Sequence, residues 1–82
     1  MDPYPNPTAG TSITIPIVVP DDDEILIDLY DDKGAYVGNI YKGAITKGLQ
    51  FIVVNSTNLR SAMNACRIAY KSQTIVKKLH KL

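Results

Sequence analysis

The two signs of charge are separated along this chain of 82 residues. All eight acidic residues lie at or before Asp32, and all nine Lys and Arg residues lie at or after Lys33, although the formal net charge is only +1. Residues 1–32 therefore carry −8, and residues 33–82 carry +9. This split indicates either an anionic partner for the basic half or pairing between the two halves. In the second case, acidic strands lie beside basic strands in one sheet.

The length and the cysteine count limit the classes of protein to which this chain can belong. A chain of 82 residues fits one small domain. One Cys and one His leave no disulfide framework and no Cys-rich zinc site, so we expect neither a metal nor a cofactor. The apolar runs are too short to span a membrane, and the first residues do not resemble a secretory signal. We therefore expect a cytoplasmic protein without membrane contact.

Prolines at alternate positions mark the first segment. Pro3, Pro5 and Pro7 block helix and sheet ladders alike and favour an extended chain. We predict that residues 1–11 form a flexible arm and that residues 12–82 form a single domain.

The segment after this arm has the alternation of β structure. Ile13, Ile15, Ile17 and Val19 fall on one face of a strand, and Pro16 favours an edge position for it. Gly34 allows the tight turn of a hairpin. Residues 49–54, Leu-Gln-Phe-Ile-Val-Val, form a nearly continuous apolar, β-branched run. Such a run indicates a central strand that is buried on both faces. The pattern predicts a four-stranded, mostly antiparallel sheet with strands at residues 12–19, 25–30, 35–41 and 49–54.

The last third of the chain shows a helical spacing of apolar residues. Residues 55–58, Asn-Ser-Thr-Asn, are typical of a helix start. A stripe with helical period follows, and a second stripe is out of phase with it. We predict a helix or a helix pair over residues 57–82, packed on one face of the sheet, and hence an α+β fold. The apolar stripe consists of Leu59, Ala62, Met63, Cys66 and Tyr70, and the second stripe of Ile75, Leu79 and Leu82.

Residues 59–82 resemble a helix-turn-helix DNA-binding motif. Ala65 supplies the small residue where two helices cross, and Ile68 supplies the apolar residue that follows it. Residues 71–74, Lys-Ser-Gln-Thr, form the polar turn, and Ile75 and Leu79 point inward from a second helix. The resemblance implies that the second helix enters the major groove of DNA.

Two functions follow from the charge and from this resemblance. The first is a small nucleic-acid-binding protein with a basic C-terminal surface. The alternative is a protein–protein interaction or assembly module, such as a small viral or phage-type accessory or structural subunit, that oligomerises through its acidic and basic halves. A homo-oligomer suits both functions, because the core is small and a strand edge is exposed. The candidate nucleic-acid contacts are Arg60, Arg67, Lys71, Ser72, Gln73, Lys77, Lys78 and Lys81.

The acidic cluster and the isolated His80 provide no catalytic arrangement. Residues 21–24 are best explained as a solvated turn, and the glycines lack the spacing of a nucleotide-binding loop. We therefore expect no enzymatic activity and no small-molecule substrate.

Overall fold

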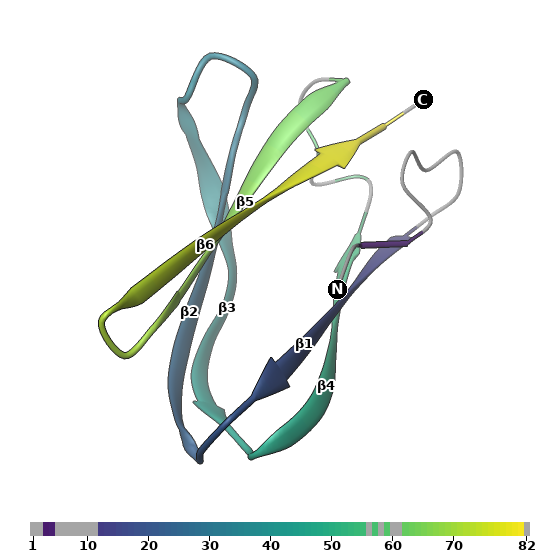
Figure 1. Ribbon diagram of the computed structural model, residues 1–82. Coiled ribbons are helices and arrows are strands. Elements are labelled where there is room, and N and C mark those ends of the chain that lie inside the picture. The colour runs from purple at the N-terminus through teal and green to yellow at the C-terminus, as the bar shows by residue number, and fades with distance from the viewer. Residues whose placement is uncertain (1–2, 5–11, 56, 58, 60–61, 82) are drawn as a thin grey trace.

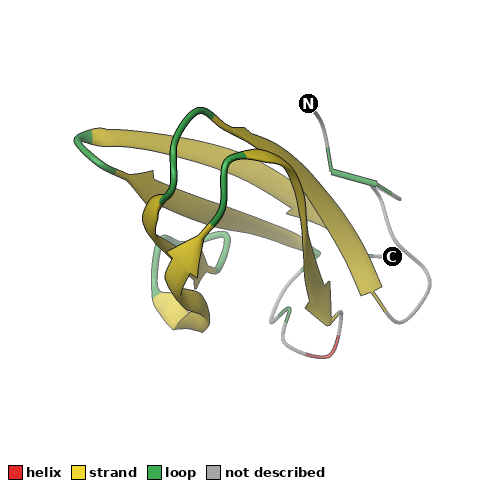
Figure 2. Cartoon of the chain, turned by 90° about the horizontal axis from the view of Figure 1, so that it is seen from below, coloured by secondary structure: helices red, strands yellow, loops and turns green. Residues whose placement is uncertain are grey.

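The computed structural model is built of β-strands. It describes residues 3–4, 12–55, 57, 59 and 62–81. The described residues form six strands and, apart from one helical turn residue at Thr57, no helix (Figures 1 and 2). The expected α+β class is therefore wrong, and the fold is nearly all β. The strands are β1 (Ser12–Val19), β2 (Asp23–Tyr30), β3 (Tyr36–Ile45), β4 (Gly48–Asn55), β5 (Met63–Tyr70) and β6 (Gln73–His80).

The strands form two sheets rather than the single sheet that we expected. One sheet has two strands in the order β1-β4, and the other has four in the order β3-β2-β5-β6. All pairings are antiparallel. In Figure 1, the β1–β4 sheet lies to the right of the four-stranded sheet. The four N-terminal strands overlap the predicted ranges, although β3 continues to Ile45, beyond the predicted end at residue 41, and the strands are divided between these two sheets.

Residues 12–55 form one long hairpin that bends into both sheets. Val19 pairs with Gly48 in one sheet, and Asp23 pairs with Ile45 in the other. Residues 20–22 in the first half of the hairpin thus face residues 46–47 in its second half. An extra residue on one side bends a β-ribbon. The same hairpin therefore supplies both strands of the smaller sheet and two strands of the larger one.

The predicted turn at the tip of this hairpin is confirmed. Gly34 has a φ of 81°, and its N–H donates to the carbonyl of Asp31 at 3.1 Å. The Asp31 carboxylate also accepts hydrogen bonds from the N–H groups of Lys33 and Ala35, each at 2.9 Å. Aspartate and glycine are the residues that such a turn requires.

The C-terminal segment is a second hairpin, so the helix-turn-helix expectation is wrong. Ala65 and Ile68 lie on β5, and Ile75 and Leu79 lie on β6. Tyr70 pairs with Gln73 across the two-residue turn Lys71-Ser72, and Lys71 has a φ of 55°. The β-branched residues Thr74, Ile75 and Val76 favour a strand over a helix.

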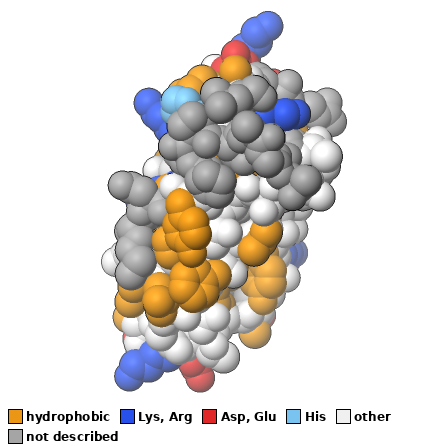
Figure 3. Space-filling model, turned by 90° about the vertical axis from the view of Figure 1, so that its right-hand side faces the viewer, with side chains coloured by type: hydrophobic (Ala, Val, Ile, Leu, Met, Phe, Trp, Pro, Cys, Tyr) orange, Lys and Arg blue, Asp and Glu red, His pale blue; other side chains and the backbone are white. Residues whose placement is uncertain are grey.

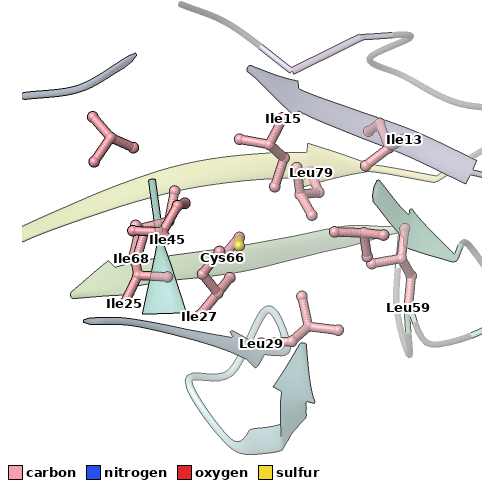
Figure 4. Packing of buried hydrophobic residues seen from close by; sticks show 12 residues of the cluster. Ile13, Ile15, Ile25, Ile27, Leu29, Ile45, Leu59, Cys66, Ile68 and Leu79 are labelled. Carbon is pink, nitrogen blue, oxygen red and sulfur yellow. The ribbon is translucent and has the colours of Figure 1, made fainter. Parts of the chain in front are cut away.

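The core lies between the two sheets. Ile13 and Ile15 of β1 extend towards β6 and β5, where Leu79 and Cys66 are completely buried (Figure 4). The face that carries Ile13, Ile15, Ile17 and Val19 is therefore the inner face of β1, as the alternation predicted. Leu59 is also buried in this core, although it lies outside any helix.

The expected helix cap is a turn at the end of β4. The side-chain oxygen of Asn55 accepts hydrogen bonds from the N–H of Thr57 at 3.0 Å and from its hydroxyl at 2.9 Å. Asparagine favours such turns for the same reason that it caps helices. Ser56 and Asn58 lie outside the described residues.

Two residues of the predicted arm are described. Tyr4 exchanges backbone hydrogen bonds with Thr14 at 2.8 and 2.7 Å, on β1, and Pro3 is buried. Residues 5–11, which we expected to be flexible, lie outside the part that the structure describes.

Candidate interaction surfaces

The β1–β4 sheet contains no ionisable side chain. Each of its two strands has 8 residues, and none of them is Asp, Glu, Lys, Arg or His. Its inner face lies on the core. Its outer face presents four large apolar side chains, which we call the uncharged face. They are Val18 (65% exposed), Leu49 (49%), Phe51 (54%) and Val53 (60%).

These four side chains form one continuous patch. Val18 lies directly opposite Leu49, and Leu49, Phe51 and Val53 are alternate residues on one side of β4. Figure 3 looks onto this side of the molecule, where hydrophobic side chains gather in the middle and charged side chains lie towards the ends and margins. A contiguous apolar patch with a charged surround is typical of an interaction site.

β4 was predicted to be a central strand buried on both faces, and this is wrong. It pairs only with β1 in the described structure, and its outer positions are exposed. Its composition nevertheless remains that of a strand with two covered faces. This mismatch between composition and exposure is the feature that distinguishes the uncharged face from an ordinary sheet surface.

The predicted nucleic-acid contacts do not form one cluster. Arg67 and Lys78 share the outer face of the four-stranded sheet, whereas Lys77 lies opposite Cys66 on its inner side. Lys71 and Ser72 form the turn, and Gln73, the first residue of β6, lies roughly 17 Å from Lys78 along the strand at about 3.3 Å per residue. Lys81 follows β6, where its N–H donates to the carbonyl of Ala62 at 2.8 Å. Arg60 lies outside the described residues.

Aromatic side chains share the outer face with Arg67 and Lys78. Tyr30 and Tyr36 are cross-strand neighbours with ring centroids 5.8 Å apart in an edge-to-face arrangement. Tyr30 also pairs with Ala65, which pairs with Lys78. The rings and the cation therefore lie in one row across the sheet, a neighbourhood that no sequence pattern indicated.

The acidic and basic halves of the sequence interleave in the fold. The acidic strand β2 lies between β3 and β5, and Asp28 is the direct cross-strand neighbour of Arg67. At the bend, the Lys71 ammonium lies 3.4 Å from the Asp21 carboxylate, and this hydrogen bond raises the pKa of Lys71. The fold thus brings acidic and basic residues from the two halves of the sequence next to one another at these two places.

The described residues form an apolar cavity and an open hollow. An apolar cavity of about 90 Å³ lies between the sheets beside Ile17, Ile68 and Ile75. This volume is below the roughly 300 Å³ at which ligand pockets begin. An open hollow of about 360 Å³ at the other end is lined by Asp31, Asp32 and Lys78, among others. Within the described residues, no group of three or more potential metal ligands occurs.

Fold and surface together define a small, two-sheet β domain with an uncharged outer face. No family model matches the chain, and neither a curated protein nor a solved structure matches it significantly. Among the described residues, no helix has the length and apolarity to cross a membrane.

Proposed function

We propose that this chain is a small assembly module, not an enzyme, and that it binds a second copy of itself through the uncharged face. The observation that carries the proposal is the 49–65% exposure of Val18, Leu49, Phe51 and Val53 on a sheet without charge. Burial of apolar surface is the dominant favourable term in protein association.

A second copy is the partner that matches this surface. A partner with charged groups at the contact would bury them without counter-charges, which is costly. The uncharged face of another copy brings apolar side chains only, and two identical patches can pack around a two-fold axis. Face-to-face packing at about 10 Å would give β4 the two covered faces that its composition favours.

A matched pair of lysine substitutions tests this function. Val53 and Val76 are both strand valines, 60% and 57% exposed, but only Val53 lies on the uncharged face. We expect Val53→Lys to lower the mass measured by analytical ultracentrifugation at a given concentration, whereas Val76→Lys leaves it unchanged. Phe51→Ser, which adds no charge, should act like Val53→Lys. Equal masses for the two lysine variants would refute the proposal.

Nucleic-acid binding is a second candidate, now on a sheet rather than a helix. It is supported by the row of Tyr30, Tyr36 and Lys78 with Arg67 beside it, because aromatic rings that stack on bases and cations that contact phosphates together bind single strands. The adjacent lysines provide the control. Lys78→Gln should weaken binding of a single-stranded oligonucleotide and reduce the log–log salt slope by about 0.7, whereas Lys77→Gln should have a smaller effect. No binding at low salt would refute this candidate.

We also assign the module to the reducing interior of the cell. The single cysteine, Cys66, is free and buried, which suits a compartment in which thiols stay reduced.

A further inference from the structure

The end strands of the two sheets differ in how their free edges are protected. An unpaired strand edge invites another strand, and proteins block it with charges, proline, bulges or a covering segment. Three of the four end strands carry such protection. β1 has Pro16 and the backbone contact of Tyr4, β3 has Lys42 and two shifts in its register with β2, and β6 has Lys77 and Lys78.

β4 has none of these protections in its described length. Its 8 residues include no proline and no charge, and its register with β1 is regular from Gly48 to Asn55. Every second N–H and carbonyl of an antiparallel strand points away from its neighbour. On β4 these outward groups face a side on which the described residues place no strand.

We propose that the free edge of β4 pairs antiparallel with β4 of a second copy, around a two-fold axis. Two β1–β4 sheets then become one four-stranded sheet. Identical strands pair here without like-charge repulsion, and the paired side chains are aromatic, β-branched or otherwise apolar in the middle of the strand, at Phe51, Ile52 and Val53. This inference rests, like the proposed function, on self-association, but its contact is made by the backbone groups at the edge of β4, and Phe51 and Val53 of the uncharged face meet their copies only beside that edge.

Edge pairing also enlarges the surface available for face-to-face packing. With the axis perpendicular to the sheet, the two uncharged faces lie side by side on the joined sheet. Two joined pairs can then pack face to face, which gives an assembly of four copies with closed symmetry.

Cysteine cross-linking tests the edge contact. Single cysteines at positions 49, 51 and 53, in a Cys66→Ala background, are oxidised alone and as mixed pairs. Strands that pair place opposite Cα atoms about 4.5–5.5 Å apart, within reach of a disulfide, whereas packed faces are about 10 Å apart. When two identical strands pair antiparallel, the residue numbers of any two opposite positions add to the same sum. We therefore expect efficient cross-links only between positions that share one such sum. An assembled protein that cross-links at none of these positions, or without such a rule, would overturn the edge pairing.

Amide hydrogen exchange gives a second readout on the unmodified chain. We expect slow exchange at alternate amides of β4 in dilute protein and at consecutive amides in concentrated protein, where the outward set gains about tenfold protection or more. β3 and β6 should keep their alternation at both concentrations. Assembly without the added protection in β4 would refute edge pairing and leave the proposed function in place, whereas a monomer at every concentration would refute both.

Discussion

Cys66 shows how strongly the core isolates a single side chain. It is fully buried between the sheets, and burial, reinforced by the negative charge of Asp28, raises the pKa of its thiol from 9.0 to about 12. At pH 8 we therefore expect the native protein to resist an aromatic disulfide reagent, because the thiolate is the reactive form. The unfolded chain should react within seconds to minutes. Rapid labelling of native protein at a rate independent of denaturant would contradict this burial.

The same pKa shift predicts a pH dependence of stability. The folded state holds the thiol proton more tightly than the unfolded state, so the contribution of Cys66 is fully present below pH 9. It is lost as the pH rises from about 9 towards 12, where the unfolded thiol ionises first. The free energy of unfolding should therefore fall more steeply over this range for the unmodified chain than for Cys66→Ala. Parallel pH profiles from urea titrations would count against it.

At the scale of elements, the C-terminal hairpin explains why the sequence predicted a helix there. Cys66 and Tyr70 are four residues apart, as are Ile75 and Leu79, and this spacing falls on one side of both a helix and a strand. Ile68 distinguishes the two, because it shares the buried side with Cys66 only in a strand. Small, common residue types at these positions also fit the helix-turn-helix pattern.

The N-terminal strands were predictable because their alternation is strict and their turn residues are specific. Ile13, Ile15 and Gly34 fix a buried face and a turn from local sequence alone. The division into two sheets was not predictable from local sequence. It depends on the bend where residues 20–22 face residues 46–47 of the same hairpin. The uncharged face was missed for a different reason, because the apolar, β-branched composition of β4 is that of a central strand with two covered faces, whereas its outer side chains are exposed at the end of a sheet.

Tyr70 of β5 forms hydrogen bonds with the bend at residues 20–22. Its hydroxyl donates to the carbonyl of Asp21 at 2.6 Å and accepts from the N–H of Asp21 at 3.2 Å. Tyr70→Phe should lower the free energy of unfolding by about 1–1.5 kcal/mol, because it removes these bonds and little apolar contact. Tyr36→Phe, at an exposed tyrosine, is the control and should change it by less than about 0.5 kcal/mol. Equal effects in denaturant titrations would show that the bend is held by other contacts.

At the scale of the whole molecule, charge and apolar surface have separate roles. The acidic and basic halves meet within the four-stranded sheet and at the bend, as the Asp28–Arg67 neighbours and the Asp21–Lys71 pair show. The uncharged face lies on the other sheet. An assembly built on charge weakens as salt screens it, whereas one built on apolar contact does not.

The mass of the unmodified chain as a function of concentration and salt tests the central claim most directly. Light scattering or sedimentation over a hundredfold range of protein concentration, at about 50 mM and about 500 mM salt, separates the two kinds of contact. We predict association that rises with concentration and is equal or stronger at the higher salt. A monomer throughout, or an assembly that dissociates at the higher salt, would contradict self-association through the uncharged face.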